Sequence, residues 1–223
     1  MTDQQKLTAD RVRELAPDGW RQIMGRLKAR FATGDLSTGL ALVAAVGAAV
    51  SEAESNVELT LSQADLVVAL TTPKVGGITM GDVERARVIT AITTGLGIAA
   101  NPAGLTQLEI GLDTTAADHL APFYAALLGA QIQGGEPVDP SGQVPTVWWQ
   151  DPTAHDQDLA LPASAIDQRW HFDVWVAHDE AAPRLQAVLN AGGRLVSDAG
   201  APSYWVVEDS EGNRSCICTP AGR

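Results

Sequence analysis

Apolar residues recur with helical and strand periods along the first hundred residues. Residues 36–54 repeat apolar side chains at helical spacing, which predicts an amphipathic helix packed on a sheet. Thr79 begins a second helix with a capping-box pattern, because Asp82 follows three positions later. Strands are expected at 20–31, 57–61 and 66–71. This order predicts an α+β domain with helices on one face of a small antiparallel sheet.

The second half of the chain repeats one pattern twice. Helices are expected at 116–128 and 180–189, and strands at 109–113, 144–150, 171–176, 204–207 and 215–218. Corresponding positions are offset by 62 residues from Glu109 to His171 and by 63 from Gly129 to Gly192. An offset that changes by only one residue indicates an internal duplication. We therefore expect a pair of βαβββ modules.

Charge changes near residue 101. Residues 1–101 hold 10 Lys and Arg against 11 Asp and Glu, whereas residues 102–223 hold 5 against 16. We therefore predict two domains with these bounds. The second half lacks the basic stripe of a nucleic-acid binder, and anionic lipid would repel it. The expected partner is a small molecule or another protein, with no nucleic acid and no membrane.

The sequence predicts neither membrane insertion nor export. Apolar residues make up 45% of the chain, but no run approaches the ~20 residues of a membrane helix. The first residues, MTDQQKLTADRVREL, lack the basic and apolar regions of a signal peptide. We expect a cytoplasmic protein in which Cys216 and Cys218 are reduced thiols.

Two stretches of the first half resemble the pterin-4a-carbinolamine dehydratase family: ARFATGDLSTGLALVAAVGAAVSEAESN and LVVALTTPKVGGITMGDVERA. The resemblance covers about residues 7–97. It implies dehydration of a 4a-hydroxytetrahydropterin, with histidines of a His-His-Pro motif and a later histidine as acid and base. Ungapped alignment places Ser55 and Asn56 at the paired histidines and Pro73 at the later one. Only Asn56 and Asp82 fit the family pattern.

All histidines of the chain lie beyond this region, at His119, His155, His171 and His178. We therefore expect a catalytically degenerate domain that binds a ligand or dimerises, in which Asp82 caps a helix. In the alternative, burial tunes Glu54, Glu58 or Asp82 as acid or base, which would leave residual 4a-hydroxytetrahydrobiopterin dehydratase activity.

Three stretches of the second half resemble the vicinal oxygen chelate superfamily of glyoxalases, ring-cleaving dioxygenases and bleomycin-resistance proteins. They are LEIGLDTTAADHLAPFYAALLGA, RWHFDVWVAHDEAAPRLQAVLNAGG and EDSEGNRSCICTP, and the match spans about residues 104–220. In metal-using members, the first and last strands of each module supply four residues that hold a divalent ion, and the ion binds two vicinal substrate oxygens. By spacing, these positions are Glu109, Trp148, His171 and Cys216.

This set differs from the usual His, Glu and Gln ligands of the superfamily. An indole cannot ligate, and a thiolate favours zinc over magnesium or manganese. One alternative keeps Glu109, His171 and Cys216 as three ligands of a divalent metal, and Gln150 replaces Trp148 if the register moves by two. In the other, His171 is hydrogen-bonded inside the cavity and Cys216 packs as a small apolar side chain.

Five of the six tryptophans lie in the second half. Metal-free members of the superfamily hold flat or cationic molecules between aromatic rings, although core filling explains single tryptophans equally well. The ligand-cavity candidates are Trp148, Gln150, His171, Trp175, Trp205 and Cys216. We expect a small-molecule-binding protein that forms a homodimer or larger homo-oligomer. The alternatives are a metal-dependent lyase or isomerase and a scaffold for a partner protein.

Overall fold

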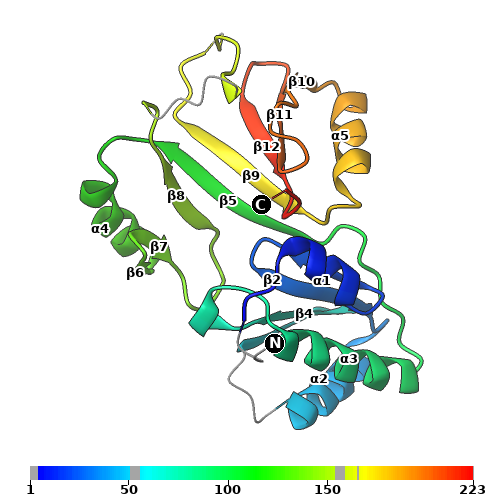
Figure 1. The fold of residues 1–223 in the computed structure, drawn as a ribbon. Helices are drawn as coiled ribbons and strands as arrows, with labels where there is room; N and C mark the ends of the chain where they lie inside the picture. Colours follow the sequence, from blue (N-terminus) through cyan, green and yellow to red (C-terminus); the bar gives the residue numbers. More distant parts are fainter. Residues whose placement is uncertain (1–4, 51–55, 154–158, 165, 223) are drawn as a thin grey trace. The chain divides into compact units, whose positions relative to one another are not determined.

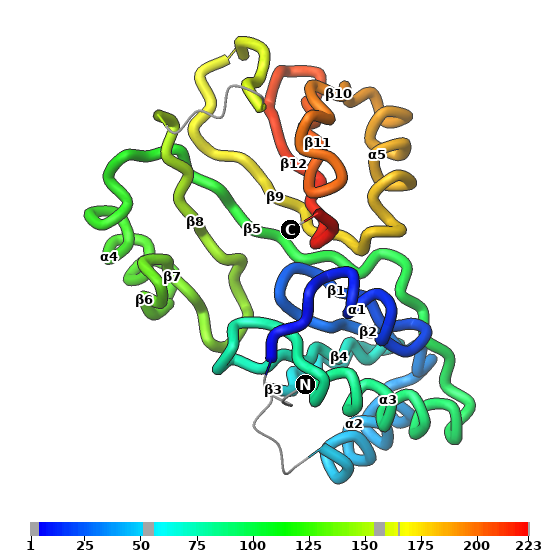
Figure 2. Tube along the Cα trace, in the orientation of Figure 1, coloured from blue at the N-terminus to red at the C-terminus, as the bar shows by residue number. Residues whose placement is uncertain are grey.

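The computed structural model describes residues 5–50, 56–153, 159–164 and 166–222. These residues divide into two compact units, one within 1–105 together with 220–223 and the other within 106–219. Figure 2 follows the chain through both units from blue to red. The expected mixed α+β class is confirmed. Within the described ranges, no helix is long and apolar enough to cross a membrane.

An antiparallel sheet forms the centre of the N-terminal unit, with strands in the order β1-β2-β4-β3, all labelled in Figure 2. Its strands are β1 (Trp20–Ile23), β2 (Arg26–Ala32), β3 (Asn56–Leu61) and β4 (Asp65–Thr71). Along β2 buried and half-buried residues alternate, because side chains two positions apart share a face of the sheet. The bounds of these four strands confirm the strands expected from the sequence at 20–31, 57–61 and 66–71.

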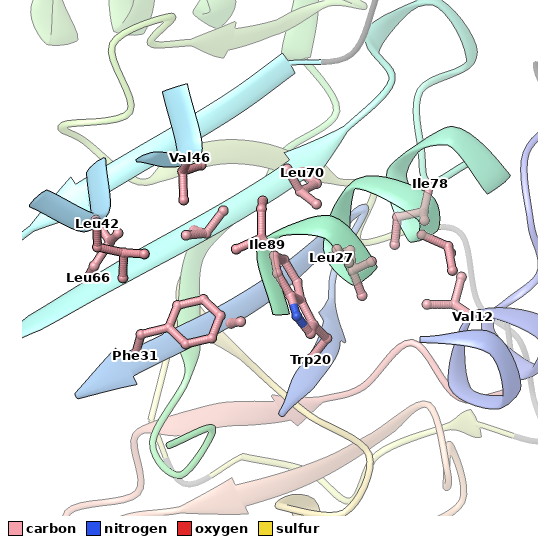
Figure 3. Close-up of a cluster of buried hydrophobic side chains, with 14 of the residues drawn as sticks. Val12, Trp20, Leu27, Phe31, Leu42, Val46, Leu66, Leu70, Ile78 and Ile89 are labelled. Atoms are coloured by element: carbon pink, nitrogen blue, oxygen red, sulfur yellow. The ribbon is translucent and has the colours of Figure 1, made fainter. Parts of the chain in front are cut away.

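Helices α2 (Leu36–Val50) and α3 (Met80–Gly95) cover one face of this sheet (Figure 1). Figure 3 shows side chains from both helices and from β2 and β4 in one buried cluster, which includes Phe31, Leu42, Val46, Leu66 and Ile89. Fully burying such a side chain contributes about 1.5–3 kcal/mol. This cluster is therefore the main stabilising feature of the unit.

A short helix, α1 (Ala9–Leu15), is present although the sequence analysis did not predict it. Thr8 caps its first turn by accepting a hydrogen bond from the backbone N–H of Arg11. Its one buried residue is Val12. A helix of two turns with a single buried position shows no recognisable period in the sequence.

The C-terminal unit contains the expected pair of βαβββ modules. The first module comprises β5 (Thr106–Asp113), α4 (Ala117–Leu128), β6 (Gln131–Gln133), β7 (Glu136–Val138) and β8 (Thr146–Gln150). The second comprises β9 (Trp170–Val176), α5 (Ala181–Asn190), β10 (Arg194–Ser197), β11 (Tyr204–Glu208) and β12 (Arg214–Cys218). The strand order β10-β11-β12-β9-β5-β8 joins the modules through their first strands. The β6-β7 hairpin forms a separate sheet.

Strands β5 and β9 pair antiparallel at the centre, where Glu109 lies opposite Asp173 and Gly111 opposite His171. The last strands, β8 and β12, each pair in parallel with the first strand of their own module. Equivalent positions of the two modules are therefore related by an approximate two-fold arrangement. Residues two apart on a strand share a face, so residues 109, 111, 171 and 173 point to the same side of the sheet.

Candidate functional site

Asp82 lies at the start of α3 in the N-terminal unit and is fully buried. Its Oδ2 accepts hydrogen bonds from the backbone N–H of Thr79 at 2.8 Å and from the Thr79 hydroxyl at 3.0 Å. The Thr72 hydroxyl donates to the same oxygen at 2.8 Å. The predicted capping box of Thr79 and Asp82 is confirmed. The Asp82 carboxylate therefore stabilises the first turn of α3.

The predicted histidine positions lie around the ends of β3 and β4. Asn56 is exposed at the start of β3, and its side-chain N–H donates to Glu58 Oε1 at 3.1 Å. Pro73 is exposed in the 3-10 turn that follows β4. The Glu58 carboxylate pairs with the Arg26 guanidinium. Ser55 and Glu54 lie outside the described residues.

In the C-terminal unit, the four positions expected at a metal site lie on one face of the sheet. Trp148 pairs with Gly111, and Cys216 pairs with Asp173, so both side chains share the side of Glu109 and His171. We call this side the Glu109 face; it also carries Asp113, Gln150 and Trp175. Both helices pack on the opposite side, the helix face: α5 on Val176 and Ile217, and α4 through Tyr124 against Trp149 and Trp170.

Glu109 is 6% exposed on β5. Its Oε2 accepts a hydrogen bond from the indole Nε1 of Trp175 at 2.7 Å. A buried carboxylate requires such donors, because leaving water without replacement hydrogen bonds costs several kcal/mol. Trp175 therefore fixes the position of the Glu109 carboxylate.

His171 lies over Gly111 on the neighbouring strand. A Cβ added to Gly111 would lie 2.4 Å from Cε1 and Nε2 of the imidazole, so only glycine leaves room for this ring. The ring meets Trp148 edge to face, with centroids 5.6 Å apart. Its Nδ1 lies 3.9 Å from Asp113 Oδ1, and its Nε2 lies 3.9 Å from Asp173 Oδ1. The imidazole is thus placed between two carboxylates and against an indole.

The thiol of Cys216 has protein partners of its own. Its hydrogen bond with Cys218 and its burial, together with the nearby Asp173 carboxylate, raise the pKa of Cys216 well above its usual range. Among the described residues, no three His, Cys, Asp or Glu side chains are grouped as a metal ion requires. Glu109, His171 and Cys216 are therefore not assembled as the predicted three-ligand set.

Comparison with known protein families assigns both units. Residues 5–92 match the family described as pterin 4 alpha carbinolamine dehydratase, and residues 109–218 match the family described as glyoxalase-like domain. The chain joins a pterin dehydratase-like domain to a glyoxalase-like domain. A crystal structure described as a transcriptional coactivator/pterin dehydratase from Brucella melitensis is 25% identical, covering 40% of this chain and 98% of its own, with a TM-score of 0.37. No curated protein matches the chain.

One predicted residue lies on the wrong side of the glyoxalase-like sheet. Trp205 pairs with Ile217 and packs under α5 on the helix face, so its assignment to the ligand cavity is corrected. Gln150 is exposed and pairs with Asp113, and Trp175 is buried, both on the Glu109 face. Sequence reasoning missed Asp113 and Asp173 on this face. The signal was their even spacing from Glu109 and His171, which places them on the same side of each strand.

Proposed function

We propose that the protein binds a small organic molecule on the Glu109 face of its glyoxalase-like domain. The observation that carries this proposal is the mixture of groups on that face. Indole rings of Trp148 and Trp175 lie beside the Glu109 carboxylate and the His171 imidazole. Binding sites for small molecules combine aromatic surface with a few fixed polar groups in this way. Both helices pack on the other side of the sheet.

The binding experiment compares two neighbouring tryptophans on opposite faces. Native mass spectrometry of the purified protein identifies the molecule that is retained, and titration follows its affinity. We expect Trp148→Ala to weaken binding roughly 2- to 12-fold, from lost aromatic contact of about 0.5–1.5 kcal/mol. Trp149→Ala, on the helix face, is the matched control and should leave affinity unchanged. Equal losses in both variants, or no retained molecule, would contradict the proposal.

The dehydratase domain of this chain is proposed to lack 4a-hydroxytetrahydropterin dehydratase activity. Ser55, Asn56 and Pro73 supply no imidazole, and acid-base groups of this kind contribute typically about 10²- to 10⁴-fold in rate. The Asp82 carboxylate, an alternative acid or base, accepts hydrogen bonds from two threonine hydroxyls and a backbone N–H. Pro73 also removes a backbone donor.

A stopped-flow assay with the carbinolamine tests this second proposal. We expect no acceleration over the uncatalysed reaction by the natural chain. The double variant Ser55→His/Pro73→His should recover part of the activity, because the proline ring is also removed. A natural chain as fast as an active member of the family would refute the proposal.

We further propose a cytoplasmic homodimer or larger assembly formed through the helices of the dehydratase domain. The large apolar residues Leu40 on α2 and Val88 on α3 are 55% and 45% exposed. Exposed apolar side chains on neighbouring helices suit association. Light scattering of the whole protein should give a mass of at least two chains, and Leu40→Glu should lower it. A monomeric natural protein would contradict this assembly.

A further inference from the structure

The positions that hold metal in related proteins carry side chains with other partners here. Trp175 donates to Glu109 at 2.7 Å, in a contact where both residues are 6% exposed. The His171 imidazole rests on Gly111 and meets the Trp148 ring edge to face. Cys216 pairs with Asp173 across strands β12 and β9. The structure thus supplies protein contacts at each of these positions.

The approximate two-fold arrangement shows which ligands have been lost. Glu109 and His171 are equivalent positions on the first strands, and Trp148 and Cys216 are equivalent positions on the last strands. At these two positions neither last strand carries an oxygen or nitrogen ligand, and Gln150, two residues farther along β8, pairs with Asp113. Protein metal sites for zinc use three or four ligands, and among the described residues no three His, Cys, Asp or Glu side chains are grouped as a metal ion requires.

We infer that this glyoxalase-like domain holds no divalent metal, because Trp148 and Cys216 have replaced the donors of its last strands. The inference deepens the proposed function. What it implies for the ligand rests on the proposal that this face binds a small molecule. Without a metal, the ligand contacts Glu109 and His171 directly. It therefore needs no pair of vicinal oxygens, the feature that a bound ion would select.

Metal loading of the natural protein is the first test. The whole chain is stripped with chelator, dialysed to equilibrium against Zn²⁺, Mn²⁺, Ni²⁺ or Fe²⁺ in turn, and analysed by elemental mass spectrometry. We expect far less than one metal per chain in every case. One equivalent of any of these ions that disappears in the His171→Ala variant would overturn the inference.

Restoring the missing donors is the second test. The double variant Trp148→Glu/Cys216→Glu returns an oxygen donor to each last strand, and it should bind about one Mn²⁺ or Ni²⁺ per chain, since carboxylate oxygens and imidazole suit these ions. The matched control is Trp149→Glu/Ser215→Glu, which places the same charges on the same strands but on the helix face. This control should bind no metal.

The metal-binding results test the inference, and they can be distinguished from the affinity measurements that test the proposed function. A double variant that folds, as judged by circular dichroism, yet binds no metal would overturn the assignment of the loss to Trp148 and Cys216. If it fails to fold, Trp148→Glu alone adds a third donor beside Glu109 and His171, and it should gain Mn²⁺ or Ni²⁺. A natural chain that binds metal overturns the inference, whereas loss of affinity in Trp148→Ala tests small-molecule binding.

Discussion

The two βαβββ modules of the glyoxalase-like domain start from one sequence pattern but pack differently. In the second module, α5 covers a buried cluster that includes Val176, Val207 and Ile217, and β10, β11 and β12 continue the sheet. In the first, β6 and β7 pair in a sheet of their own, and Phe123 and Leu127 of α4 are 60% and 65% exposed. Duplication therefore reproduces the elements, whereas their burial depends on which neighbours each helix meets.

The largest expected difference between the modules concerns their stability. Ile217 is 3% exposed beneath α5, so Ile217→Ala should lower the free energy of unfolding by about 2–5 kcal/mol through lost burial and a cavity. Leu127→Ala is the matched change on α4 and should stay within about 0.5 kcal/mol, because that side chain is already exposed. Urea unfolding followed by tryptophan fluorescence measures both. Similar costs would show that α4 packs as tightly as α5.

A second difference lies at the centre of the sheet. Position 111 of the first module corresponds to position 173 of the second, and glycine at 111 makes room for the His171 ring. Gly111→Ala should destabilise the domain by about 1–3 kcal/mol, because the added Cβ forces the imidazole to move.

A double-mutant cycle separates this contact from the general effect of removing glycine. Gly111→Ala in a His171→Ala background should cost much less than in the natural chain. Gly47→Ala, in a helix with open space around it, is the control and should not destabilise the protein. Equal costs of Gly111→Ala in both backgrounds would mean that the His171 ring does not require glycine.

Local periods explain why most helices and strands could be predicted from the sequence. Helical and strand spacing are properties of short segments, and the capping box of Thr79 and Asp82 needs only four residues. The β6 strand could not be found, because it has three residues and all are exposed. A strand held mainly by its hairpin partner shows no apolar period.

The candidate site was predicted less completely, because it depends on contacts between strands. Spacing placed Glu109 and His171 on one face, as the strand register bears out. The number of tryptophans in this half led to Trp205 being placed in the ligand cavity. The face of a strand residue depends on its register, and Trp205 pairs with Ile217 on the helix face. The hydrogen bond from Trp175 to Glu109 joins residues 66 positions apart, so no local sequence pattern predicts it.

The smallest expected effect on stability concerns the turn that precedes the last strand of each module. The two turns are compared through their aspartates. Asp139 accepts hydrogen bonds from the Ser141 hydroxyl at 2.7 Å and from the backbone N–H groups of Ser141 and Gln143 at 2.8 Å, which lowers its pKa to about 2. The Asn213 side chain and backbone N–H likewise lower the pKa of Asp209.

A pKa lowered in the folded protein adds stability that is present above the ordinary aspartate range and is lost as the pH falls through the folded pKa. Asp139→Asn and Asp209→Asn should therefore each reduce stability at pH 5 slightly and flatten its decline toward pH 2. Carbon NMR titration of the natural chain should show the Asp139 carboxylate protonating near pH 2. An Asp139 that titrates in the ordinary range, beside an Asp209 that does not, would show that the two turns are stabilised differently and that the duplication has diverged there as well.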